Sequence, residues 1–191
     1  MDRQFIDLIA GARAAVIIKD DGGFCLYANR REEELRGVLP GELVGKHITE
    51  LVDADPALVE REFEQFKHEH TWVGQFRTHD AAGNPVRLRT CNFIHCESDG
   101  TALYASFAYL VGPRDPSARD RSVLLPDVTF AAEDQCTAQL CVDGYSDEEL
   151  AVVFGISLDA VRQLVARFVQ SIGANSRTEA CIRALKSGLV A

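Results

Sequence analysis

The sequence lacks any apolar run close to the roughly 20 residues that a membrane-spanning helix requires. Its first residues, MDRQFIDLIAGARAAVII, carry charges among the apolar positions and lack the basic start and cleavage site of a signal peptide. We therefore expect a cytoplasmic protein without a membrane segment.

Metal-ligand spacing is also absent. The six cysteines stand at positions 25, 91, 96, 136, 141 and 181, and no two form a C-x-x-C pair. In a reducing compartment, scattered cysteines are mostly small buried apolar side chains. The chain also has no recognised nucleophile–base motif and no phosphate-binding glycine loop. We expect neither a metal site nor an enzyme.

Positive charge is scarce, because 20 Lys and Arg stand against 29 Asp and Glu and give a net charge of −9. An acidic chain has no general attraction to nucleic acid or to anionic membranes. A nucleic-acid partner would therefore require a local basic patch.

The 191 residues leave room for two small domains. Three of the six prolines fall in VGPRDPSARDRSVLLPD, where they exclude a continuous helix or a central strand. We therefore divide the chain into residues 1–112, a linker at 113–126, and residues 127–191.

The first part mixes strands and helices. Apolar, partly β-branched runs around a DGG turn predict a hairpin, helical spacing follows, and three strands end the part. Side chains in 86–97 alternate between a face suited to a core and a mixed face, as in a half-exposed antiparallel sheet. The expected strands are 14–20, 24–29, 72–80, 86–97 and 101–112, and the expected helices are 30–36, 42–52 and 55–70.

Two fragments of this part, YANRREEELRGVLPGELVGKHITELV and TWVGQFRTHDAAGNPVRLR, resemble the signatures of PAS domains. The resemblance covers about residues 5–112. It implies an α+β fold, in which a five-stranded antiparallel sheet and flanking helices form a cup. Such cups bind haem, flavin or a small metabolite, or are filled by side chains in domains that only dimerise.

The resemblance gives weak cofactor candidates. His68 and His70 stand where haem-binding PAS domains carry an axial histidine, although a polar helix end explains them equally well. Trp72 occurs in flavin-binding and in empty PAS domains, and Asn29 belongs to the first signature. The Asn-Cys-Arg-Phe motif of photochemical flavin domains is absent, so we reject a light-driven cysteine adduct. An apolar cup that holds side chains or an unidentified small molecule remains the simplest reading.

Residues 127–191 carry the capping and turn residues that are typical of short helices. Ser146 and Glu149 form a capping-box pattern, Gly155 marks a turn, and Ser157 is an N-cap candidate for the next helix. Together with SIGANSRTEA and ALKSGLV, this pattern resembles the LuxR-type (NarL-like) helix-turn-helix domain over residues 127–191. The resemblance implies a small all-α domain with four helices near 131–142, 147–153, 158–172 and 176–187.

The charges of this part do not suit DNA. It carries five cations and nine anions, a net charge of −4. Glu148, Asp159 and Ala160 replace residues that the family usually uses for contact. Leu164, on the helix that would read DNA, either belongs to a partner-docking surface or packs in the core. The resemblance leaves five candidate DNA contacts: Ser157, Arg162, Gln163, Arg167 and Arg177.

Two functions follow from these resemblances. The first is a one-component, bacterial-type transcriptional regulator, a homodimer whose PAS domain senses or dimerises and whose helix-turn-helix binds DNA. The alternative is a protein-interaction module, in which the acidic domain mediates dimerisation or docks on a partner regulator that it antagonises. Under both we expect a dimer. The apolar N-terminal residues Phe5, Ile6, Leu8 and Ile9 would pack on the outer face of the sheet or on a partner, and the last helix, with Ile182, Leu185 and Leu189, resembles the dimer helix of the LuxR-type family.

Overall fold

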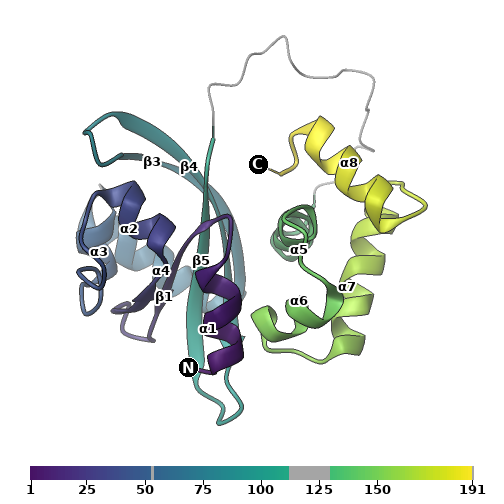
Figure 1. Cartoon of the computed structure of the whole chain (residues 1–191), viewed down its shortest axis with the longest axis horizontal. Helices are drawn as coiled ribbons and strands as arrows, with labels where there is room; N and C mark the ends of the chain where they lie inside the picture. Colours follow the sequence, from purple (N-terminus) through teal and green to yellow (C-terminus); the bar gives the residue numbers. More distant parts are fainter. Residues whose placement is uncertain (53, 112–129, 191) are drawn as a thin grey trace.

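The computed structural model describes residues 1–52, 54–111 and 130–190. Its centre is one antiparallel sheet with the strand order β2-β1-β5-β4-β3 (Figure 1). The fold is therefore the α+β class expected from the sequence. The strands are β1 (Ala15–Lys19), β2 (Cys25–Ala28), β3 (Thr71–His79), β4 (Pro85–Cys96) and β5 (Ala102–Leu110).

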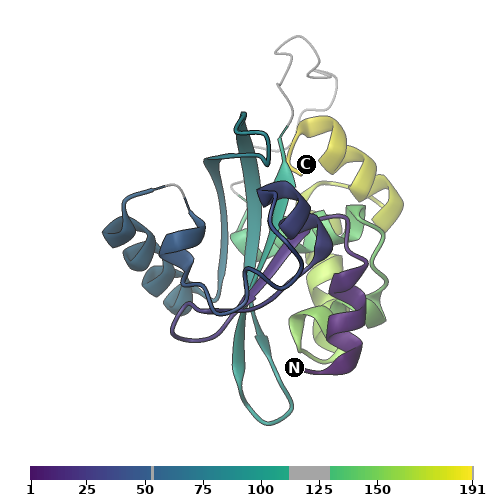
Figure 2. The same cartoon turned by 60° about the vertical axis from the view of Figure 1, so that its left-hand side comes forward.

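Helices cover both faces of the sheet (Figure 2). One face is covered by α2 (Arg30–Arg36), α3 (Ile48–Leu51) and α4 (Pro56–Glu69). The opposite face is covered by α1, α5 and α6, and α7 and α8 lie behind these three. The bounds of this second group are α1 (Arg3–Ala10), α5 (Ala132–Val142), α6 (Asp147–Phe154), α7 (Leu158–Ser171) and α8 (Arg177–Ser187).

The helix expected over residues 42–52 is wrong in its first half. Gly41 and Gly45 have φ angles of 80° and 83°, so the chain turns there instead of winding into a helix. The short helix α3 begins only after His47, whose backbone N–H donates to the Glu50 carboxylate in a capping box. The two glycines determine the backbone conformation of this segment, and the helical spacing of its apolar residues did not reveal the turn.

The caps predicted around α6 and α7 are present. The Ser146 hydroxyl accepts from the Glu149 N–H at 3.1 Å, and the Glu149 carboxylate accepts from the Ser146 N–H at 2.7 Å. Gly155 ends α6 in the left-handed conformation with φ 66°, and Ser157 caps α7. Two helices joined by a tight turn result, and α5 and α8 complete the C-terminal helical unit.

The mixed face of β4 is buried, which corrects the expectation of a half-exposed sheet. Arg89, Cys91, Phe93 and His95 are all buried, because α5 and α6 pack against them. One hydrophobic core therefore runs from this outer face of the sheet into the C-terminal helical unit. The apolar N-terminal helix α1 joins it, and Phe5 and Ile9 are fully buried there.

The linker predicted at 113–126 lies outside the described residues. Within the described ranges, no helix combines the length and the apolar character needed to cross a bilayer.

Candidate functional site

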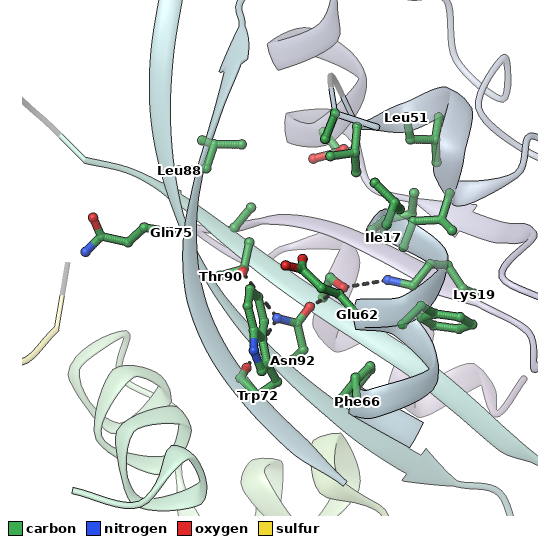
Figure 3. A pocket seen from close by; sticks show the side chains of 18 of the residues that line it. Ile17, Lys19, Leu51, Glu62, Phe66, Trp72, Gln75, Leu88, Thr90 and Asn92 are labelled. Carbon is green, nitrogen blue, oxygen red and sulfur yellow. Dashed lines mark hydrogen bonds between the residues drawn. The ribbon is translucent and has the colours of Figure 1, made fainter. Parts of the chain in front are cut away.

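A cavity of about 340 Å³ lies between the inner face of the sheet and α2, α3 and α4 (Figure 3). Three adjacent strands, β1, β5 and β4, form its floor, because alternate residues of each strand point inward. The floor residues are Ile17, Lys19, Ser106, Ala108, Leu88, Thr90 and Asn92. Apolar side chains form most of the walls: Ile48, Leu51, Val52, Leu58, Val59, Phe63, Phe66 and Trp72.

A chain of hydrogen bonds crosses the floor of the cavity. The Lys19 ammonium donates to the Ser106 hydroxyl at 2.6 Å, and this hydroxyl donates to the Asn92 side-chain oxygen at 2.5 Å. The Asn92 amide nitrogen in turn donates to the Thr90 hydroxyl at 3.2 Å. Ser106 and Asn92 face each other in the β4–β5 register, so the sheet itself fixes this polar chain.

Lys19 is a buried cation, because its residue is only 3% exposed. Burial lowers the pKa of its ammonium from 10.5 to about 8, although the nearby Glu32 carboxylate opposes this shift. Glu32 is itself buried and forms an ion pair with Arg36 at 2.5 Å. In the described contacts, Ser106 accepts the one hydrogen bond that the Lys19 ammonium donates, although an ammonium carries three N–H groups.

Trp72 forms one wall of the cavity and depends on a glycine. A Cβ atom at Gly74 would lie 1.9 Å from the Trp72 indole, so the indole occupies the space that a side chain at position 74 would take. The ring also packs against the aromatic cluster of Phe63, Phe66 and Tyr104. This contact gives a physical reason for the Trp-x-Gly pattern of the sequence.

The structure does not support His68 and His70 as haem ligands. Both are exposed at the end of α4, and the His70 ring is paired with the His68 carbonyl oxygen at 2.9 Å. Neither is among the described residues that line the cavity, and none of those residues is a histidine, cysteine, methionine or tyrosine. These residues do not fit a haem group, because no side chain of the lining offers an axial ligand to its iron.

Asn29 is a structural residue and not a ligand of the cavity. Its side-chain oxygen accepts from the N–H groups of Val16 and Glu32 at 2.9 and 3.1 Å. Its amide nitrogen donates to the carbonyl oxygens of Ile9 and Ala14 at 3.1 and 3.0 Å. Because these four bonds use the side chain's capacity, Asn29 ties α1, β1 and α2 together.

The outer face of the sheet carries polar contacts to the C-terminal helical unit. Tyr109 donates to the Asp143 carboxylate at 2.6 Å, and Arg89 donates to the side-chain oxygen of Gln135 at 2.8 Å. The Nδ1 atom of His95 lies 3.1 Å from the carbonyl oxygen of Val153. The C-terminal helical unit is thus docked by specific hydrogen bonds as well as by apolar packing.

Aromatic rings complete this interface. The His95 ring stacks on Phe5 with centroids 4.0 Å apart, and Phe93 meets Phe154 edge to face at 4.9 Å. Because β4 sends Asn92 into the cavity and Phe93 into this interface, one strand contacts both parts of the molecule.

Three of the predicted DNA contacts lie at the exposed start of α7. Ser157, Arg162 and Gln163 are all exposed, and Arg162 is paired with the neighbouring Asp159 at 3.3 Å. Leu164 is buried, so it packs in the core and does not form part of a docking surface. Three of the five candidates are therefore exposed near the start of α7.

The other two candidates are held by carboxylates of the same unit. Arg167 binds Asp134 at 2.6 Å and also Glu133, and both carboxylates raise the pKa of its guanidinium. Arg177 is half-buried and binds the Asp147 carboxylate and the carbonyl oxygen of Tyr145. Sequence reasoning missed these pairs, because they join residues about thirty positions apart.

The polar chain of the cavity was also missed. The sequence held a weak signal for Lys19, because strand alternation in AVIIK places it on the same face as Ile17. In the described part of the chain, no group of three or more His, Cys, Asp or Glu residues could hold a metal ion.

Comparison with known proteins identifies the family of the chain. Residues 3–105 match the sequence model of the PAS fold, which is more than half of the 191 residues. The protein therefore belongs to the PAS family. None of the curated proteins compared with it matches at a significant level.

The fold of the chain is also similar to that of several solved structures. The LOV protein of Rhodobacter sphaeroides is 14% identical, with a TM-score of 0.57 over 96% of this chain and 95% of that chain. The complex of Vibrio cholerae VqmA with a ligand and DNA is 18% identical, with a TM-score of 0.48 over 99% of this chain and 88% of that chain. At 14% identity, the likeness to the LOV protein shows a shared fold and nothing more.

Proposed function

We propose that this protein is a sensory regulator, in which a small molecule in the PAS cavity controls a C-terminal helix-turn-helix domain that binds DNA. The observation that carries the proposal is the position of β4, whose inner side chains line the cavity and whose outer side chains hold the C-terminal helical unit. A displacement of side chains on one face of this strand would shift the side chains on the other face, because closely packed interiors transmit strain.

Asn92 is the residue at which the two faces meet. Its side chain belongs to the polar chain of the cavity. Its backbone carbonyl oxygen lies 3.9 Å from the Cys136 thiol, which donates to it from α5. A ligand that rearranges the Lys19–Ser106–Asn92 chain would therefore shift the strand segment against which α5 packs.

The DNA-binding face would be the outward side of α7. In helix-turn-helix proteins the second helix enters the major groove, and its first residues contact base edges. Here Ser157, Arg162 and Gln163 are exposed at this end of α7. A homodimer would place two such helices on a two-fold symmetric site, with half-sites about one helical turn apart.

The acidic surroundings set the strength of this binding. Phosphate contacts by Lys and Arg supply most non-specific affinity, and this affinity falls steeply with salt. Arg167 and Arg177 would have to exchange Asp134, Glu133 and Asp147 for phosphate. We therefore expect weak binding that is lost at moderate salt.

A second candidate function rests on the same ion pairs. All four arginines of the C-terminal helical unit are paired with carboxylates within the unit. Ile182 and Leu185 are exposed on α8, at 49% and 51%. These features favour a surface that docks on another protein, for example a partner regulator, without a DNA contact.

Retention of fragmented genomic DNA by the purified full chain distinguishes the two functions. Arg162→Glu should abolish retention at low salt. Arg3→Glu is the matched control, since Arg3 is exposed on α1 and the substitution changes the net charge equally. Equal retention by both variants would refute the proposed reading helix, and no retention by any form would favour the protein-docking function.

A further inference from the structure

The charges around the cavity do not cancel at its floor. Lys19 stands on β1, and the ion pair of Glu32 and Arg36 faces it from α2. The Cys25 thiol adjoins Lys19 from β2, and burial raises its pKa to about 11, so it stays neutral. The interior groups therefore sum to one positive charge.

Among the described residues of the lining, Glu62 is the remaining charged group. It is exposed on α4 and reaches toward the cavity from that side (Figure 3). Because Glu62 is an exposed residue, water screens its charge more than that of a buried carboxylate. Lys19 is buried at the floor of the cavity, so its positive charge stays under-compensated there.

The rest of the cavity favours the flat, apolar part of a ligand. Phe63, Phe66 and Trp72 bring three aromatic rings to one side, and Leu51 and Leu88 add aliphatic surface. A volume of about 340 Å³ is at the lower end of the range for small-molecule sites, roughly 300–1,000 Å³, so the ligand would have about the size of one substituted ring.

We propose that the cavity binds a small aromatic acid as its monoanion, with the carboxylate on the Lys19 ammonium and the ring between Trp72, Phe63 and Phe66. The carboxylate would accept the N–H groups that Lys19 does not direct to Ser106. This inference rests on the proposed sensory function, for which it names the ligand class. The anion also supplies the compensation that a buried ammonium requires.

The Lys19 ammonium gives the binding a defined pH dependence. Its pKa of about 8 in the free protein means that it is mostly charged at pH 7 and loses its proton above pH 8. An anion bound to it raises this pKa. Affinity for the anion should therefore be constant between pH 6 and 7 and fall as the pH passes 8 and 9. Affinity for a neutral analogue should not fall in this way.

The test uses the full chain and three probes of one shape, benzoate, benzamide and benzylamine, titrated by protein-observed NMR at pH 7. Benzoate should bind about tenfold or more tightly than benzamide, and benzylamine should bind most weakly. Lys19→Met should remove the preference for benzoate and leave the affinity for benzamide. Lys67→Met is the matched control, because Lys67 lies over the same Phe63 ring at 5.4 Å but does not line the cavity.

Several results would overturn the inference. These are equal binding of benzoate and benzamide, tightest binding of benzylamine, no binding of any probe, or a benzoate preference that survives Lys19→Met. Should that variant not fold, the pH profile of benzoate binding by the unaltered chain decides instead, and a flat profile through pH 9 refutes the role of Lys19.

These titrations contain no DNA, so the inference and the proposed function fail separately. If the protein prefers benzoate but retains no DNA, the proposed ligand class is supported and the proposed DNA-binding function is refuted. If it retains DNA but does not prefer benzoate, the DNA-binding function is supported and the ligand class is refuted.

Discussion

Gly155, in the turn between α6 and α7, lies directly against the backbone of Cys96 at the end of β4. A Cβ atom at position 155 would be 2.6 Å from the Cys96 carbonyl oxygen and 2.9 Å from its nitrogen. The same glycine has a φ angle of 66°, which ends α6. One residue therefore shapes the turn between α6 and α7 and permits this turn to approach the PAS sheet.

Gly155→Ala should destabilise the protein in two ways. The left-handed backbone costs a residue with a side chain roughly 1–2 kcal/mol, and the contact with Cys96 adds about 1 kcal/mol or more. Gly144→Ala is the control, because its φ is 97° but nothing lies within 4 Å of its Cβ position. Urea unfolding should show the larger loss for Gly155→Ala, and equal losses would mean that the Cys96 contact has no energetic weight.

Asn29→Ala should lower the free energy of unfolding by about 3 kcal/mol or more, because it removes an N-cap and leaves buried backbone groups unsatisfied. Asn175→Ala, at an exposed asparagine, should change stability by less than about 0.5 kcal/mol. Chemical denaturation measures both. A small effect of Asn29→Ala would contradict the structural role assigned to this side chain.

Gly74→Ala should displace the indole of Trp72 from the cavity wall. Trp72 is the only tryptophan, so its fluorescence reports on this site alone. We expect a shift of the emission to longer wavelength and weaker benzoate binding. Gly11→Ala is the comparison, since its Cβ would meet no atom closer than 3.9 Å. Unchanged emission from Gly74→Ala would show that the indole does not rest on position 74.

Releasing Arg167 should strengthen DNA retention. The double variant Glu133→Gln, Asp134→Asn removes both carboxylates that hold this guanidinium. Because the Asp134 side chain is only 11% exposed, the variant should also lose some stability, which urea unfolding measures separately. Asp7→Asn with Glu60→Gln changes the net charge equally at distant, exposed positions. Retention across a salt series should rise for the first pair only. An equal rise for both would indicate a general charge effect.

His95 should make the docked interface weaker in acid. Burial holds the pKa of its imidazole below the ordinary 6.5, although Val153, Glu97 and Asp2 oppose this shift. In the described part of the chain, its Nε2 atom has no hydrogen-bond partner. The unfolded chain therefore binds the proton more readily, so stability should fall as the pH drops through 6.5. His95→Gln should remove this dependence between pH 7 and 5, and an unchanged slope would assign it to other groups.

Local signals in the sequence predicted much of the fold. The caps at Ser146, Gly155 and Ser157 could be anticipated, because they depend on hydrogen bonds and φ angles within a few residues. The strands themselves were predicted from alternation and turns, and the five-stranded sheet from the resemblance to PAS domains. The outer face of β4 could not be anticipated, because Arg89 and His95 look like solvent-facing residues. Their partners Gln135 and Val153 lie 46 and 58 positions away in the sequence.

The candidate site was predicted only in part. Ser157, Arg162 and Gln163 are exposed, and their role as DNA contacts stays a prediction. The polar chain of Lys19, Ser106 and Asn92 was not predicted, since it joins three strands through register and not through a motif. The cofactor candidates His68 and His70 are exposed at the end of α4 and are not among the described lining residues, a position that the sequence pattern did not reveal.

The most direct test of the account is selection of genomic DNA fragments by the purified full chain at several salt concentrations, followed by sequencing of the retained pool. The account predicts that retained fragments share a two-fold symmetric sequence, and that retention falls steeply as salt rises. A pool without any shared sequence, even at low salt and with benzoate added, would contradict it.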